Sequence, residues 1–210
     1  MEPPMRSTIP PQKYSENGVE LIYPKDTLAR GTWIGISEKQ RLVCLLNRGF
    51  QNHQRNSYYR MSRGIVVKNI LSVEDAVAYI EDFYFTDIEP FTLVLVDWSL
   101  GRKAYELVWD GTQKHFQELN QEPRIWSSST LHTEEMKSDR KEWFWEWLQA
   151  QDGFHQNEIL AFHKSTNKGT LETTLKMKCP FVEIVSVTSI EKKEELSIKY
   201  IDLLNNCNSL

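Results

Sequence analysis

Cysteine is scarce in this sequence, with only Cys44, Cys179 and Cys207 among 210 residues. The three are far apart and form no C-x-x-C pair, so neither a disulfide framework nor a zinc site of that kind is indicated. The five histidines show no H-E-x-x-H spacing, which leaves no reason to expect a metal or another cofactor. The simplest interpretation is a protein of a reducing compartment, and we expect it to be cytoplasmic.

Long apolar runs and an excess of positive charge are also missing. No run approaches the length that a bilayer span needs, and the opening Met-Glu-Pro-Pro-Met-Arg lacks the pattern of a signal peptide. A formal net charge of -4 argues against a nucleic-acid partner or an anionic membrane surface. With 40% hydrophobic and 26% charged residues, the composition is that of a globular protein. We expect a single domain over residues 1–210.

The stretch Gly31–Phe50 predicts a hairpin of two strands, 32–37 and 42–47, joined by the polar turn Glu-Lys-Gln-Arg. Apolar residues alternate onto both faces of the second strand, which predicts a strand covered on both sides. Cys44 lies within it, and we expect this thiol to pack in the core rather than react. The strand ends at Asn47, whose neutral amide is of the kind that stabilises a developing oxyanion.

Groups of strands and helices alternate along the rest of the chain. Helices are expected at 65–71, at 134–149 and at 158–164, and a further helix should begin after an N-cap at Ser72. Strands are expected at 19–23, 91–97, 104–109, 115–119, 181–188 and 196–203. Residues 1–14 hold four prolines and should form an extended arm. Two-sided apolar strands favour an α+β protein, a four-layer α/β/β/α sandwich of two antiparallel sheets. A single antiparallel sheet with helices on one face is the alternative.

Three further patterns have both a functional and a structural interpretation. The stretch from Lys39 to Val73 has basic but no acidic residues, so it either attracts a carboxylate or phosphate or is a solvated basic loop. Ser128 lies in a serine run after a predicted strand and either donates to an oxyanion or caps a loop. Trp143 and Trp147 share a helix face, where core packing explains them better than a cofactor site. No G-x-S-x-G motif suggests a serine hydrolase.

The string Gly-Thr-Trp-Ile-Gly-Ile-Ser at 31–37 resembles the NRDE family, which is related to the transport and Golgi organisation proteins. Leu-Leu-Asn at 45–47, Ser-Arg-Gly at 62–64 and Pro-Phe-Thr-Leu at 90–93 support the resemblance in the same order. It implies the α/β/β/α fold of N-terminal nucleophile hydrolases, in which a terminal cysteine thiolate attacks an amide or acyl carbonyl and the amino group of that cysteine can act as base.

Family chains typically begin Met-Cys and run through a first strand to an Asn-Arg-Asp-Glu tetrad. Here Glu2 matches the glutamate of the tetrad, Met1 stands where its aspartate should be, and Arg6 matches the arginine that follows. The first strand and the terminal cysteine are absent. We expect either a truncated or misassigned start, or a natural short form without activity. A missing strand should leave an unpaired sheet edge beside the hairpin or the proline-rich arm.

Two functions follow from the resemblance. The first is an amide or acyl hydrolase of non-peptide C–N bonds, inactive in the chain as given, with Asn47 as the oxyanion donor and Ser128, where relatives often have asparagine, as a second candidate. The expected substrate-binding residues are Arg6 and Arg63, which would orient a substrate carboxylate, Glu2, which would hold Arg6 or the nucleophile loop, and Trp33. The second is a non-catalytic protein that binds a small haem-like or lipid-like molecule. Either way, the expected partner is a small molecule with a carboxylate or acyl group.

Overall fold

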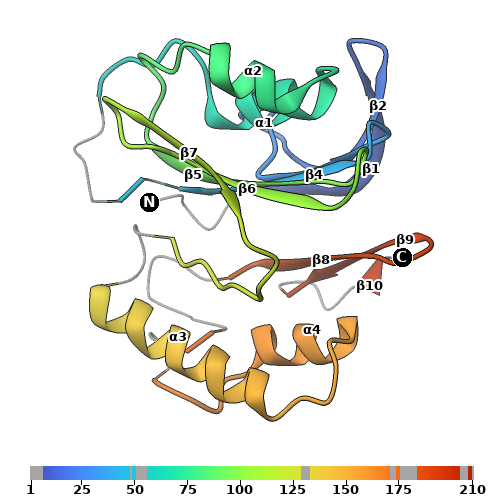
Figure 1. Ribbon diagram of the computed structural model, residues 1–210, viewed down its shortest axis with the longest axis vertical. Helices are drawn as coiled ribbons and strands as arrows, with labels where there is room; N and C mark the ends of the chain where they lie inside the picture. Colours follow the sequence, from blue (N-terminus) through green and yellow to red (C-terminus); the bar gives the residue numbers. More distant parts are fainter. Residues whose placement is uncertain are drawn as a thin grey trace. The chain divides into compact units, whose positions relative to one another are not determined.

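The computed structural model describes residues 7–47, 49–50, 56–128, 133–170, 174–175, 184–203 and 208–209. The chain forms two compact units, one of Ser7–Leu131 and one that holds His132–Leu210. Among the described residues, each unit contains one antiparallel sheet and two helices (Figure 1). This confirms the predicted α+β class with two antiparallel sheets, and the alternative of a single sheet is wrong.

The unit Ser7–Leu131 is built on a seven-stranded sheet in which each strand pairs antiparallel with its neighbours in sequence. The strands are β1 Thr8–Glu16, β2 Val19–Asp26, β3 Ile34–Ser37, β4 Arg41–Asn47, β5 Phe91–Asp97, β6 Lys103–Trp109 and β7 Lys114–Leu119. Asp110 and Gly111 lie in the short connection between β6 and β7, where Gly111 takes a φ of 106°. A residue with a Cβ rarely adopts that conformation.

Helices α1, Arg63–Ser72, and α2, Ala76–Asp82, cover one face of this sheet (Figure 1). Their apolar residues meet alternate residues of the strands, and together they form the core of the unit. The largest fully buried side chains of this core include Tyr23, Phe91, Leu21, Ile70, Leu71, Ile80, Leu93 and Leu95. Each such side chain stabilises the fold by roughly 1.5–3 kcal/mol on burial.

The start of α2 differs from the prediction. Ser72 is the last residue of α1 rather than an N-cap, and its hydroxyl donates to the carbonyl of Lys68 at 2.8 Å. Asp75 takes the capping role, because its carboxylate accepts the backbone N–H of Ala78 at 2.9 Å. Both residue types suit caps, and the sequence alone did not separate them.

Arg41 is buried, with 3% of its surface exposed, and fastens the end of α1 to β4. Its guanidinium donates to the carbonyls of Ile70 at 3.2 Å, Val73 at 2.9 Å and Glu74 at 2.7 Å. Its Nε lies 3.2 Å from the carboxylate of Asp97 on β5. The last carbonyls of a helix lack partners within the helix, so one arginine here satisfies three carbonyls at the helix end and neutralises a carboxylate.

The hairpin β3–β4 has no free edge, since β3 pairs with β2 and β4 with β5. Of the two places predicted for an unpaired edge, the hairpin is therefore excluded. At the proline-rich arm, Thr8–Glu16 forms β1, which pairs with β2 and is the terminal strand in the order of this sheet. Pro10 and Pro11 lie at the register shift between Ile9 and Gln12, because an edge strand tolerates residues without an N–H at an irregularity.

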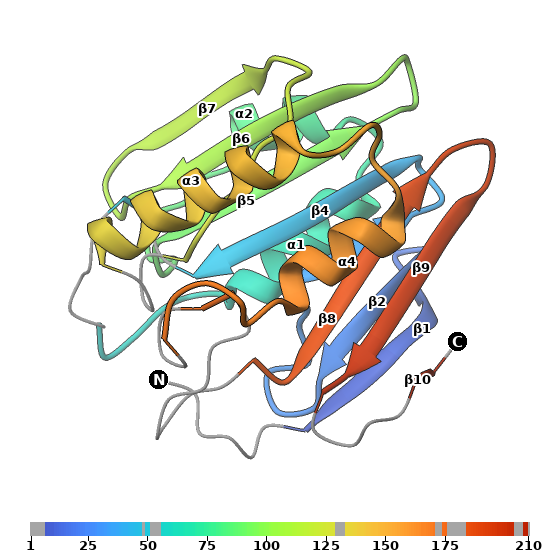
Figure 2. The ribbon, with the colours of Figure 1, turned by 90° about the horizontal axis from the view of Figure 1, so that it is seen from below.

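The unit that holds His132–Leu210 has a three-stranded sheet in the order β10–β9–β8, with β8 Ser186–Lys192, β9 Leu196–Asp202 and β10 Asn208–Ser209. Its helices are α3, Glu134–Gln149, and α4, Gln156–Lys164, and the bounds of α3 are those predicted. The strand expected at 181–188 begins at Ser186, and residues 181–183 lie outside the described residues. Figure 2 shows α4 beside β8, and the two are joined by a hydrogen bond of 3.5 Å from Gln156 Nε2 to the carbonyl of Ser189.

Candidate functional site

Asn47 is the last residue of β4, where it pairs with Phe91, the first residue of β5, and its side chain is exposed. The hydroxyl of Ser128 donates to the backbone carbonyl of Asn47 at 3.0 Å, although the two residues are 81 positions apart. The two predicted catalytic candidates therefore meet directly at one end of the seven-stranded sheet, here called the Asn47 end.

The two glycine-containing strings of the resemblance meet at the start of α1. A Cβ added to Gly31 would lie 2.9 Å from the Cα of Gly64, and one added to Gly64 would lie 2.8 Å from the backbone nitrogen of Thr32. Such distances are too short for any side chain to fit between the two backbones. The segment that leads into β3 thus packs directly on the first turn of α1, and this contact positions Arg63 and Trp33.

Arg63 and Trp33 both lie near the Asn47 end, since each contacts a residue of β4 or of the segment before β5. The guanidinium of Arg63 lies 3.2 Å from the carboxylate of Glu89 and donates to the carbonyl of Pro90 at 3.2 Å, immediately before β5. The carbonyl of Trp33 accepts the N–H of Leu45 on β4 at 2.7 Å. Of the other predicted substrate-binding residues, Glu2 and Arg6 lie outside the described residues.

The basic stretch after Lys39 is held largely by protein partners. Lys39 pairs with the carboxylate of Glu74, and Lys68 lies 2.6 Å from that of Glu16. Arg60 donates to the backbone carbonyls of Thr86 and Tyr84. Arg48 and Arg55 lie outside the described residues. These contacts, with those of Arg41, favour a structural role for Lys39, Arg60 and Lys68 over an anion-binding patch.

A carboxylate–imidazole pair at the same end of the sheet was missed by the sequence reasoning. Asp110 Oδ2 lies 2.8 Å from His115 Nε2. Burial alone would raise the pKa of Asp110, but the N–H of Gln113, the ring of His115 and Thr112 hold that pKa well below its usual range. The ring of Phe50 packs edge-on against His115 at 4.9 Å. A histidine five residues after the aspartate of an Asp-Gly turn was the only signal available.

Cys44 is a poor candidate nucleophile, because burial raises the pKa of its thiol to about 11. Cys179 and Cys207 lie outside the described residues. Among the residues that the structure describes, no three side chains of His, Cys, Asp or Glu gather as a metal site. In the same part of the chain, no helix has the length and apolar character needed to cross a membrane.

The fold of two antiparallel sheets, each with two helices among the described residues, is similar to that of solved structures. Penicillin V acylase from Agrobacterium tumefaciens matches with a TM-score of 0.50 and 13% identity, over 95% of this chain and 74% of that one. A variant of conjugated bile acid hydrolase from Clostridium perfringens matches with a TM-score of 0.37 and 10% identity, over 54% of this chain and 42% of that one. The predicted α+β fold class with two antiparallel sheets is confirmed, and the fold is similar to that of the penicillin V acylase.

The family is fixed by sequence. The family model described as transport and Golgi organisation 2 matches residues 2–206, and the chain belongs to this family. The resemblance to the NRDE proteins is thereby confirmed. A comparison with curated proteins gave no match.

Proposed function

We propose that this protein is an amide or acyl hydrolase of non-peptide C–N bonds, and that the Asn47 end of its seven-stranded sheet binds the oxyanion. The observation that supports this most is the hydrogen bond of 3.0 Å from Ser128 to the carbonyl of Asn47, which joins two distant segments beside an exposed amide side chain. A neutral donor fixed before the reaction begins stabilises the developing negative charge without reorganisation, and such a donor is worth about 3–4 kcal/mol of transition-state energy.

Ser128 and Asn47 have different roles in this proposal. The Ser128 hydroxyl donates its proton to a backbone carbonyl, so it holds the end of β4 in place and acts as a positioning residue. The side-chain amide of Asn47 supplies the N–H groups that meet the oxyanion. Arg63 would contribute to the binding of a substrate carboxylate, and its ion pair with Glu89 at 3.2 Å fixes the direction of its guanidinium.

The nucleophile in this proposal is the terminal cysteine that the family resemblance implies for a full-length protein. Its amino group would take the proton of the thiol as the sulfur attacks the carbonyl carbon, and the amine would leave with that proton as the C–N bond breaks. Water would then hydrolyse the thioester that remains, which releases the acid and restores the thiol. Cys44 is unsuited because burial raises the pKa of its thiol to about 11. The name of the acylase above, which acts on penicillin V, supports an amide substrate, and we place the enzyme in the cytoplasm.

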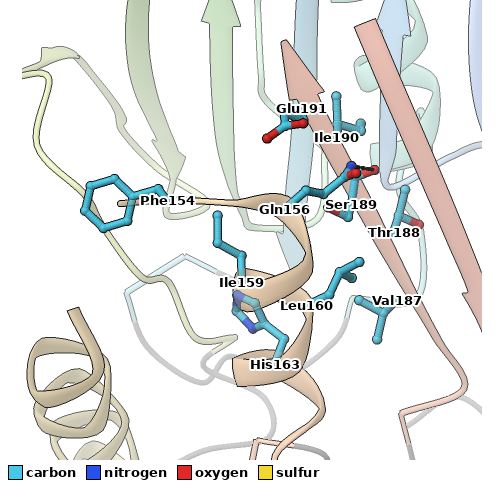
Figure 3. A pocket seen from close by; sticks show the side chains of 10 residues that line it. All are labelled: Phe154, Gln156, Ile159, Leu160, His163, Val187, Thr188, Ser189, Ile190 and Glu191. Carbon is cyan, nitrogen blue, oxygen red and sulfur yellow. Dashed lines mark hydrogen bonds between the residues drawn. The ribbon is translucent and has the colours of Figure 1, made fainter. Parts of the chain in front are cut away.

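A different observation favours the alternative, a non-catalytic protein for a small apolar or anionic ligand. A cavity of about 300 Å³ lies between α4 and β8. Figure 3 shows Ile159, Leu160 and Val187 among the residues that line it. This volume is at the lower end of the range for small-molecule sites. An acyl chain or a small ring fits it better than a large cofactor.

Steady-state kinetics on the full-length protein separates these functions. With penicillin V and p-nitrophenyl acyl esters as substrates, the hydrolase proposal expects Asn47→Ala to lower kcat by about 100-fold or more, with little change in KM. Ser128→Ala should lower kcat by a smaller factor. Asn56→Ala is the matched control, because Asn56 is an exposed asparagine outside the strands. Ligand binding without turnover, unaffected by Asn47→Ala, would support the alternative.

A further inference from the structure

A larger cavity, of about 560 Å³, lies between α3 and α4, on residues that the hydrolase proposal does not use. Trp143, Glu146 and Trp147 line it from α3, and Glu158, Ala161 and Phe162 line it from α4. Each set has the i, i+3, i+4 spacing that places side chains on one helix face. The cavity, here called the α3–α4 groove, is therefore formed by two facing stripes of side chains.

The aromatic walls of the groove are held from behind. The rings of Trp147 and Phe162 have their centroids 4.9 Å apart, and Phe144 lies 5.9 Å from Phe162 and 6.0 Å from Trp147. Phe144 and Phe162 are each 8% exposed, so this cluster is well packed. Trp143 and Trp147 remain half-buried and line the cavity. Indole rings that are fixed in this way offer flat faces at little entropic cost.

The described lining of the groove has more acidic than basic side chains. Glu146 and Glu158 line it together with one cation among the described residues, Lys168, which forms an ion pair with Glu146. Glu158 accepts a hydrogen bond of 3.4 Å from the backbone N–H of His155, at the positive end of α4. Within the described lining, the Glu158 carboxylate thus has no cation of the groove opposite it.

We propose that the α3–α4 groove binds a small organic cation with apolar substituents, such as an aromatic or quaternary ammonium compound. The negative face of an indole ring attracts a cation by about 0.5–2 kcal/mol, depending on how far the site is desolvated. Two indole rings and the Glu158 carboxylate together select a cation over a neutral or anionic molecule of the same shape. The proposal is independent of the hydrolase function, because it uses a separate set of residues in the other unit.

Isothermal titration calorimetry of the full chain tests this proposal with three probes of similar shape. Benzyltrimethylammonium should bind at least about tenfold more tightly than neutral benzyl alcohol and than benzenesulfonate, as the cation–π attraction predicts. Glu158→Gln should weaken the binding of the cation by about three- to tenfold and leave that of benzyl alcohol within about twofold. Equal affinity for the three probes, or no heat with the cation at millimolar concentration, would overturn the proposal.

Variants on the same two helices locate the site. Trp147→Leu should lower the affinity for the cation at least about tenfold, whereas Trp145→Leu should leave it within about twofold, because Trp145 is 48% exposed and does not line the groove. Trp147 also contacts Phe162, so its replacement could unfold the helix pair. Ala161→Trp avoids this problem, because it fills the groove from an exposed position and removes no contact. Unchanged binding in Ala161→Trp would show that the cation binds elsewhere.

Discussion

Arg41→Met should destabilise the unit Ser7–Leu131 far more than its position in a basic stretch suggests. The substitution removes a side chain that is 3% exposed and donates to three carbonyls at the end of α1. It also leaves Asp97, whose side chain is 17% exposed, without the guanidinium 3.2 Å away. Each unsatisfied buried group costs about 1–3 kcal/mol, and removing one partner of a buried ion pair costs about 3–5 kcal/mol.

The two contributions are not additive, because water can reach some of the groups that lose the guanidinium. We therefore expect a loss of about 4 kcal/mol in the free energy of unfolding. With a urea m-value of about 2–3 kcal/mol/M, the unfolding midpoint should fall by about 1.5 M. Urea titration followed by tryptophan fluorescence measures this shift, and Trp109, 5% exposed in the same core, contributes to the signal.

Lys39→Met is the matched control two residues away. Lys39 pairs with Glu74, whose side chain is 85% exposed, and such surface pairs contribute at most about 1 kcal/mol. The midpoint of this variant should therefore change by less than about 0.4 M. A shift of that size or smaller in Arg41→Met would refute the assignment of Arg41 as the residue that completes the end of α1.

Three further changes test other parts of the structure. Gly64→Ala should lower Tm by several degrees, because the added Cβ would lie 2.8 Å from the backbone of Thr32. Gly153→Ala should leave Tm unchanged, because its Cβ would have its nearest contact at 3.7 Å. Differential scanning fluorimetry measures both Tm values. Asp110 has a folded pKa well below its unfolded value, so it contributes stability above about pH 4 that is lost as the pH falls. Asp110→Asn should therefore reduce the loss of stability at acid pH, as measured by urea titration at several pH values. The same loss of stability at acid pH in this variant and in the wild type would contradict this. Cys44 should resist iodoacetamide at about pH 8 in the folded protein and react in urea, because burial raises the pKa of its thiol to about 11. Peptide mass mapping measures the labelling, and rapid labelling of Cys44 in the folded protein would argue against this.

Elements with strong local signals could be predicted from the sequence. The bounds of β5, Phe91–Asp97, and α3, Glu134–Gln149, are those expected, because long periodic segments specify their own conformation. β1 could not be predicted, because its strand character comes from pairing with β2 and its prolines suggested an arm. The role of Arg41 was equally hidden, since it depends on where the last carbonyls of α1 lie in space.

The candidate site, too, could be predicted from the sequence only in part. The family strings identified Asn47, and the structure adds that Ser128 reaches its carbonyl from 81 residues away, a contact that no local pattern contains. The pair of Asp110 and His115 was missed because a turn aspartate is usually explained by the turn itself. The glycines of two strings turned out to be one contact, Gly31 against Gly64, with a Cβ-to-Cα distance of 2.9 Å.

The most direct test of the hydrolase proposal is a covalent adduct on the full-length protein. When the protein is treated with a p-nitrophenyl acyl ester and analysed by mass spectrometry, the hydrolase proposal expects one acyl group, on the terminal cysteine that this proposal requires. Asn47→Ala should slow the formation of this adduct by about 100-fold or more, with Asn56→Ala at the wild-type rate. A folded protein that forms no adduct, or forms it equally fast without the Asn47 amide, would contradict the account.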